Sequence, residues 1–193
     1  MAYSKINDVI GYIHGEMVKN IGSGAAIDIR GWLDVSMWET FIVPAKVTYD
    51  VARAYKKWYD QVKTGGPWDH KKYIKKTFGE WSLDDAQKRL YFFDIWSNIH
   101  YGYVGVSCGF PEDDLLAGAG LAQWMAGTVP PGAGDRISDP SVSGVIAALD
   151  DPQDQWAIKV GFELWDTYHQ YLVPEYILKA VRKYSKLLDT KPA

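Results

Sequence analysis

Apolar residues recur at every third or fourth position along most of the chain, which is the spacing of one face of an α-helix. Regular alternation of apolar and polar residues, which is typical of strands, is scarce, and residues 103–107 are the best strand candidate. We therefore expect a mainly α fold, a single globular helical domain with little or no strand. The periodicity predicts helices over residues 4–20, 34–63, 70–78, 83–97 and 111–123, and further helices beginning at Asp151 and Pro174.

Glycine, proline and capping residues set the expected boundaries of these helices. Pro44 should begin a new helix or kink a long one, and Ser82 with Asp85 has the form of a capping box for the helix over 83–97. That helix should end near residues 100–102, because Tyr-Gly-Tyr-Val-Gly suits a turn. Residues 22–31 are small and predict a loop, and residues 128–144, with three prolines and three glycines, predict a long one.

Composition narrows the class of protein. Nearly half of the 193 residues are apolar, enough for a core, and we expect residues 1–193 to form one unit. The nine tryptophans and thirteen tyrosines can fill that core or line a sugar-binding cleft. A net charge of −3 argues against a general nucleic-acid binder but leaves room for a nuclease with a local basic groove. Cys108 is the single cysteine, so an internal disulfide is excluded.

Membrane and export signals are not evident in the composition. The first twenty residues lack the basic start and apolar run of a signal peptide, and no apolar run approaches the ~20 residues that a membrane span needs. We therefore expect no membrane span and no signal peptide in this chain. A protein of this kind that acts outside the cytoplasm needs another carrier.

The stretch 92–109 concentrates the candidate chemistry. Asp94, Asn98, His100 and Tyr101 lie within eight residues of one another, among aromatic and aliphatic neighbours. Polar groups in such surroundings are partly buried and need either partners or a chemical role. Two interpretations stay open: these side chains form the floor of an active site, or they pair with the free carbonyl groups of a helix end.

A second group of polar residues precedes the helix over 70–78. Asp69 can cap that helix or take part in chemistry. His70 and Lys71 fall in its first turn, where positive charge opposes the helix dipole, which indicates another use for them. Trp68 stands beside them as a possible stacking surface.

Acid–base hydrolysis is the chemistry that these residues favour. A carboxyl group in an apolar pocket has a raised pKa and can donate a proton, and two carboxylates ~5–9 Å apart suit cleavage of a glycosidic bond. A histidine with an acid would equally suit cleavage of a phosphodiester. The candidate carboxylates are Asp69, Glu80, Asp94 and Asp154.

Other catalytic motifs are weak or missing. Residues 105–109 match G-x-S-x-G, but the alternating strands and helices that such a nucleophile requires are not predicted. The sequence holds no H-E-x-x-H, no paired cysteines and no glycine-rich phosphate loop. We therefore expect no metal and no cofactor.

Three segments of the sequence are distinctive when taken together: G-G-P-W-D-H-K at 65–71, D-I-W-S-N-I-H-Y-G-Y-V-G at 94–105 and L-L-A-G-A-G-L-A-Q at 115–123. A fourth is D-D-P-Q-D-Q-W-A-I-K-V-G at 150–161. They resemble the bacterial polymorphic toxin type 44 domain over about residues 58–165, with residues 1–57 as an N-terminal helical part. Ser97 stands where this family usually has the glycine of a Gly-Asn pair, which bears on the local turn more than on the polar residues.

The resemblance implies an antibacterial effector domain at the C-terminal end of a larger secreted or injected protein, with a cognate immunity protein as its partner. We expect it to act as a monomer. The first hypothesis is a hydrolase of peptidoglycan glycan strands, the second is a nuclease that acts on RNA or DNA in the cytoplasm, and the third is a non-enzymatic binding module. The candidate catalytic residues are Asp94, His100, Asp69 and Glu80, and the candidate substrate-binding residues are Trp68, His70, Lys71, Asn98, Tyr101, Tyr103 and Asp154.

Overall fold

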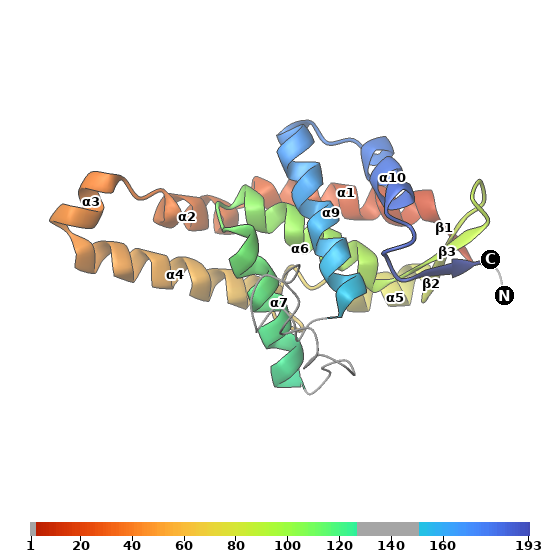
Figure 1. Cartoon of the computed structure of the whole chain (residues 1–193), viewed down its shortest axis with the longest axis horizontal. Helices are drawn as coiled ribbons and strands as arrows, with labels where there is room; N and C mark the ends of the chain where they lie inside the picture. Colours follow the sequence, from red (N-terminus) through yellow and green to blue (C-terminus); the bar gives the residue numbers. More distant parts are fainter. Residues whose placement is uncertain (1–2, 127–150) are drawn as a thin grey trace.

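The computed structural model describes residues 3–126 and 151–193, and it is mainly helical, as predicted. Figure 1 shows the helices gathered around α6, with a small sheet at one end of the molecule. Within the described ranges, every helix is too short or too polar to span a bilayer. The elements in chain order are β1 (Ser4–Lys5), α1 (Ile6–Ile21), α2 (Gly24–Leu33), α3 (Met37–Ile42), α4 (Pro44–Val62), α5 (Lys71–Phe78), β2 (Trp81–Asp84), β3 (Arg89–Phe92), α6 (Asp94–Ser107), α7 (Glu112–Ala126), α9 (Pro152–Tyr168), the 3-10 helix η2 (His169–Tyr171), α10 (Pro174–Lys183) and β4 (Thr190–Pro192).

Helix α6 lies at the centre of the fold, and α9 crosses it at close range (Figure 1). Two glycines allow this approach: a Cβ added at Gly102 would lie 2.1 Å from the carbonyl oxygen of Ile158, and one at Gly161 would lie 2.3 Å from that of Ile99. Any side chain at either position would therefore force the two helices apart.

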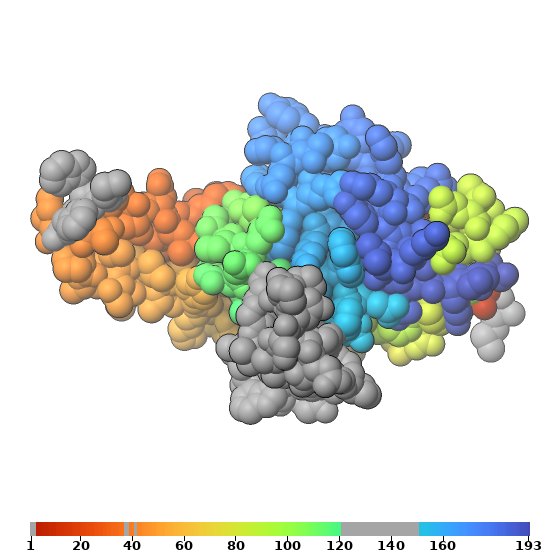
Figure 2. Space-filling model, viewed as in Figure 1, coloured from red at the N-terminus to blue at the C-terminus, as the bar shows by residue number. Residues whose placement is uncertain are grey.

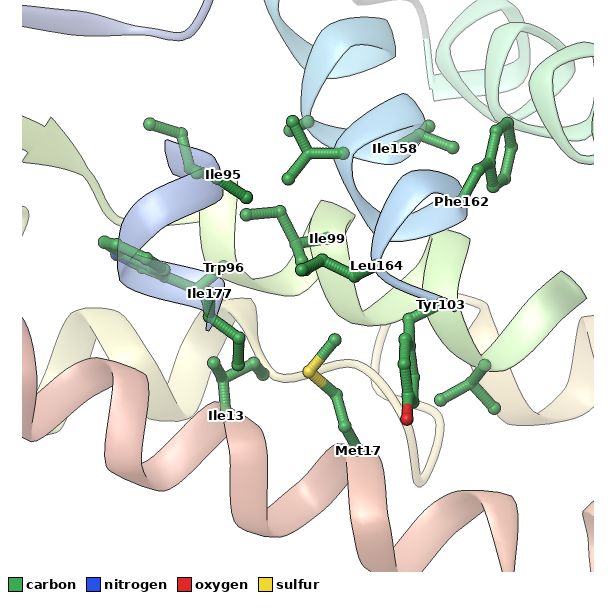
Figure 3. Packing of buried hydrophobic residues seen from close by; sticks show 14 of the residues in the cluster. Ile13, Met17, Ile95, Trp96, Ile99, Tyr103, Ile158, Phe162, Leu164 and Ile177 are labelled. Carbon is green, nitrogen blue, oxygen red and sulfur yellow. The ribbon is translucent and has the colours of Figure 1, made fainter. Parts of the chain in front are cut away.

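The core on the other side of α6 is built by α1. Ile13 and Met17 of α1 point towards α6 and α10, and both are fully buried (Figure 3). They pack in one cluster with Trp96 and Ile99 of α6 and Ile177 of α10. This packing holds α6 between α1 and α9.

A four-stranded sheet in the order β1-β2-β3-β4 closes one end of the molecule. Strand β1 pairs parallel to β2, while the pairs β2–β3 and β3–β4 are antiparallel. The buried carboxylate of Asp84 accepts two hydrogen bonds from Arg182, at 2.7 and 2.8 Å, which fixes α10 to the β2–β3 hairpin. The C-terminal segment thus reaches back to the middle of the chain.

The predicted helix over 83–97 is wrong, because residues 81–92 form the β2–β3 hairpin instead. The segment from Ser82 to Asp85 is a strand and the start of a turn, not a capping box, and Lys88 adopts a left-handed backbone with φ of 51° in that turn. The side chains that β2 buries, Ser82 and Asp84, are polar. The sequence of β2 therefore lacks the apolar residues at alternate positions that would have predicted a strand.

The predicted end of that helix at 100–102 and the strand over 103–107 are also wrong. Helix α6 runs without a break from Asp94 to Ser107. Its glycines serve close helix packing, as Gly102 shows, and not a turn. The predicted loop over 22–31 is likewise mostly helical: α2 begins after Ser23, whose hydroxyl accepts a hydrogen bond from the Ala26 amide at 3.2 Å.

Helices α2, α3 and α4 project from the rest of the molecule as an arm (Figures 1 and 2). Pro44 begins α4, Asp151 caps α9 and Pro174 begins α10, and these three predicted starts are confirmed. The long loop predicted over 128–144 lies outside the described residues. The inner end of α4, where the arm joins the body, forms part of the site described next.

Candidate active site

A cavity of about 630 Å³ lies where the inner end of α4 meets α6, α7 and α9. The lining comes from the second half of α4, from residues 97–101 of α6, from the first two turns of α7 and from Asp154 and Ile158 of α9. The turn between α4 and α5 supplies the remaining edge. The lining residues are Tyr55, Trp58, Tyr59, Val62, Lys63, Thr64, Trp68, Asp69, Lys71, Lys72, Ser97, Asn98, Tyr101, Phe110, Asp114, Leu115, Gly118, Ala119, Asp154 and Ile158.

Aromatic rings make up much of the wall, with Trp58 at their centre. Its ring centroid lies 5.7 Å from that of Trp68, 5.1 Å from Tyr101 and 5.2 Å from Phe110. Tyr101 is fixed further by its hydroxyl, which donates to the Leu115 carbonyl at 2.9 Å. Rings held by several neighbours in this way form a rigid apolar surface against which a flat ligand can stack.

The carboxylate of Asp154 lines the cavity, and that of Asp94, which is not part of the lining, lies near enough for the charge of Asp154 to raise its pKa. Asp94 is the first residue of α6, and Asp154 lies in the first turn of α9. Asn98 of α6 contacts Asp154 of α9, and Gly102, one turn later on α6, contacts Ile158. The Asn98 side-chain amide donates to Asp154 Oδ1 at 2.8 Å. The helix starts therefore bring together two acids that are sixty residues apart.

The pKa of Asp94 is raised to about 7, first by burial of the carboxyl group and second by the negative charge of Asp154. One oxygen of Asp94, Oδ1, is buried and has no hydrogen-bond partner among the described residues. Burial also raises the pKa of Asp154, while the charge of Lys71 and the hydrogen bond from Asn98 oppose that shift. Asp94 is thus suited to carry a proton near neutral pH, and Asp154 is the better stabilised as an anion.

The turn before α5 delivers the second predicted group to the cavity. Trp68, Asp69 and Lys71 all line it. Asp69 also organises the turn, because its carboxylate accepts from the Gly65 amide at 2.9 Å and from the Lys71 amide at 3.2 Å. The capping role predicted for Asp69 is not found, because His70 is the N-cap residue of α5 and no side chain caps the helix. The Asp69 carboxylate instead closes the turn before α5 and remains in the cavity lining.

The two histidines lie behind the wall and not in it. His100 is 1% exposed, and its Nε2 lies 3.3 Å from His70 Nε2 and 2.9 Å from the Asn20 side-chain amide. The Tyr12 hydroxyl lies 3.0 Å from His70 Nδ1. Burial lowers the pKa of His70 and lowers that of His100 well below its ordinary value, so both rings are neutral near pH 7. The contacts of these two rings link three helices, namely α1, α6 and the start of α5.

Two further predicted residues are not part of the cavity wall. Glu80 is exposed and forms an ion pair with Lys75 at 3.0 Å, and the hairpin strand that follows it leads away towards the sheet. Tyr103 is buried, and its hydroxyl donates to the His169 carbonyl at 2.5 Å on the core side of α6. The structure brings together Trp68, Asp69, Lys71, Asn98, Tyr101 and Asp154 in one lining, with Asp94 beside them.

Sequence reasoning missed several residues of the site. Tyr55 and Trp58 belong to an apolar stripe of α4, a helix that the sequence predicted without assigning it any part in the site. Asp114 lines the cavity and accepts a hydrogen bond from Tyr55. Asp189, just before β4, adds negative charge that raises the pKa of Asp94. The stripe was a visible signal for the aromatic wall, whereas nothing local pointed to Asp189.

The described side chains form no cluster of potential metal ligands. Among them, no group of three or more histidine, cysteine, aspartate or glutamate residues is placed to hold a metal ion. The described lining offers carboxyl, amide, hydroxyl and ammonium groups.

Comparison with known proteins gives a family but no close relative. Neither a curated protein nor a solved structure matches this chain. The family model of bacterial toxin 44 matches residues 57–167, which is more than half of the chain. The matched segment holds Lys71, Asp94, Asn98 and Asp154, together with the helices that position them. The chain belongs to the bacterial toxin 44 family.

Proposed function

We propose that this toxin domain is a hydrolase that cleaves glycosidic bonds in the glycan strands of peptidoglycan, with Asp94 as general acid and Asp154 as general base. One observation carries the proposal: the partly buried carboxyl group of Asp94, whose pKa is raised to about 7, lies near a second carboxylate, Asp154, that lines an aromatic cavity. Paired carboxyl groups with different protonation states are the usual equipment for this reaction.

The proposed reaction follows from the protonation state that the surroundings of each acid favour. The proton on Asp94 passes to the glycosidic oxygen as the bond from that oxygen to the sugar carbon breaks. A water molecule attacks the same carbon and gives its proton to Asp154, whose anionic form is favoured by the charge of Lys71 and the hydrogen bond from Asn98. Trp58 and Tyr101 offer apolar faces against which the sugar rings stack.

The nuclease alternative has one observation in its favour, which is that three lysines, Lys63, Lys71 and Lys72, line the cavity. Three aspartates, Asp69, Asp114 and Asp154, line it too. A polyphosphate chain would meet as many negative as positive groups there, so the cavity lacks the basic field of a nucleic-acid groove. The predicted role of His100 as the base of a nuclease is not supported by its sealed position behind the wall.

Membership of a toxin family also supports two proposals about context. We propose that the domain is delivered into a target bacterium as part of a larger effector, and that a cognate immunity protein protects the producing cell. Both follow from the family and not from the site.

Cleavage assays on two purified substrates test the proposed reaction. Wild-type protein should release soluble glycan fragments from sacculi and leave total RNA intact. Asp94→Asn and Asp154→Asn should each slow the release by roughly a hundredfold or more, the usual contribution of a general acid or base. Asp8→Asn is the matched control, because Asp8 also stands in the first turn of a helix but is exposed.

Two results would refute the proposal: degradation of RNA with no change in sacculi, or full activity in the Asp94→Asn protein. Circular dichroism of each variant would show that a loss of activity is not a loss of fold. In cells, toxicity should appear only when the domain is exported to the periplasm, and toxicity confined to the cytoplasm would point to the nuclease.

A further inference from the structure

Two consecutive lysines at the start of α5, Lys71 and Lys72, line the cavity near the acid pair. Lys71 is half-buried and Lys72 is exposed. Neither ammonium group forms an ion pair with any residue that the structure describes, whereas Lys63 pairs with Asp60 at 2.9 Å. Lys71 and Lys72 are therefore available to a ligand in the cavity.

The position of these lysines is not explained by the stability of α5. Positive charge at the first turn of a helix opposes the helix dipole and destabilises the helix slightly. The last turn, where lysines are favourable, already holds Lys75 and Lys76. A use in ligand binding gives a reason for cations at the less favourable end.

The charge of the lining limits what the lysines can bind. Lys71 acts on both carboxylates of the acid pair, since its charge lowers the pKa of Asp94 and of Asp154. Lys71 is thus placed near the reacting groups, with Lys72 next to it in the lining, while Asp114 is hydrogen-bonded to Tyr55 of α4. This arrangement suits one anionic group close to the cleaved bond and does not suit a chain of phosphates.

We infer that Lys71 and Lys72 bind a carboxylate on the substituent of an amino sugar, placed beside the glycosidic bond that reaches Asp94 and Asp154. This inference rests on the proposed function, and it deepens it by naming the substrate as a carboxylate-bearing glycan. In wall glycans, that carboxylate comes from the stem peptide or, in strands stripped of peptide, from the lactyl ether group. A neutral amino-sugar polymer such as chitin lacks it.

Binding measurements separate these ligands without depending on cleavage. Asp94→Asn protein would be titrated calorimetrically with four probes: a wall tetrasaccharide with stem peptides, the same tetrasaccharide with free lactyl carboxylates, chitotetraose and a short oligoribonucleotide. At least one carboxylate-bearing tetrasaccharide should bind roughly tenfold or more tightly than chitotetraose, as expected for hydrogen bonds to a charged group. Which of the two binds more tightly identifies the source of the carboxylate.

Lysine variants in the same Asp94→Asn background test whether Lys71 and Lys72 bind the carboxylate. Lys71→Gln and Lys72→Gln should each weaken the preferred tetrasaccharide roughly tenfold and leave chitotetraose unchanged. Added salt should weaken the preferred tetrasaccharide more than chitotetraose. Lys76→Gln is the control, because Lys76 is an exposed lysine of the same helix that does not line the cavity.

Three outcomes would overturn the inference: chitotetraose binding as tightly as the wall tetrasaccharides, lysine variants that bind like the control, or an oligoribonucleotide that binds more tightly than every glycan. The failure of the proposed reaction is visible separately. Cleavage of sacculi by the wild type without carboxylate selectivity would refute this inference alone, and selectivity without cleavage would refute the acid–base assignment alone.

Discussion

The crossing of α6 and α9 is the contact on which the geometry of the acid pair depends. Asp94 lies two turns before Gly102 on α6, and Asp154 lies two turns before Gly161 on α9. Because the helices touch backbone to backbone at these glycines, their separation there sets the separation of the two carboxylates. We expect Gly102→Ala both to destabilise the protein and to reduce its activity.

The size of the effect follows from the contact. A Cβ at Gly102 would lie 2.1 Å from the Ile158 oxygen, whereas ordinary contact begins at 3.4 Å, so the helices must part by about an ångström. Overpacking costs ~1–3 kcal/mol, and the upper end applies because the obstructing atoms are backbone and cannot rotate away. Alanine returns ~1 kcal/mol as the better helix former. The net loss is about 2 kcal/mol, or a melting temperature lower by roughly 4–8 °C.

Urea unfolding followed by far-ultraviolet circular dichroism would measure this loss. Gly11→Ala is the matched control, since Gly11 is an exposed glycine of α1 with no atom within 4 Å of an added Cβ, and it should stabilise by ~0.5–1 kcal/mol. Displacement of a reacting group by about 1 Å costs on the order of a hundredfold in rate. If Gly102→Ala stabilises the protein as Gly11→Ala does, the reasoning from close helix contact is refuted.

Three further measurements concern buried charge. Asp94→Asn should raise the melting temperature more at pH 8 than at pH 5, because the Asp94 pKa is raised to about 7 in the fold, so the wild type loses stability as pH rises from ~4 to ~7. Equal shifts in melting temperature at both pH values would contradict this. The wild type should lose stability as pH falls below ~6.5, since the pKa values of His70 and His100 are lowered in the fold. In melting experiments over the same pH range, the melting temperature of His100→Gln should fall less than that of the wild type. Arg182→Met should lower the free energy of unfolding in urea by ~3 kcal/mol or more at pH 7, because it leaves the Asp84 carboxylate buried and unpaired, and an unchanged value would show that the pair contributes little.

The sequence predicted those features whose cause is local. A proline at Pro44 or Pro174 and an acid at Asp151 mark helix starts through their own backbone and side-chain chemistry, and all three were placed correctly. The candidate acids Asp94 and Asp154 were recognised because carboxyl groups among aromatic residues need a reason to be there. That the two meet depends on the α6–α9 crossing, which no local pattern encodes.

The errors have a common physical cause, which is that the deciding partner lies far away in the sequence. Asp84 is buried in a strand because Arg182, ninety-eight residues later, neutralises it. Gly102 sits inside a helix because α9 presses against it, while sequence reasoning took the same glycine for a turn. Glycine fits both a turn and a close approach of backbones, and only the partner helix distinguishes the two.

Continuity of α6 also decides what its polar residues do. At about 100° per residue, Asn98 and Tyr101 lie within roughly 40° of Asp94 around the helix, while His100 lies roughly 120° away. An early end to the helix would have let His100 turn towards the acids; the uninterrupted helix sends it to the core, where it meets His70. The imidazole pair then acts on the site only through its neighbours. His70 is followed directly by Lys71, and His100 is followed directly by Tyr101. The contact between the two neutral imidazole rings therefore holds Lys71 and the aromatic wall close to α6, the helix that carries Asp94.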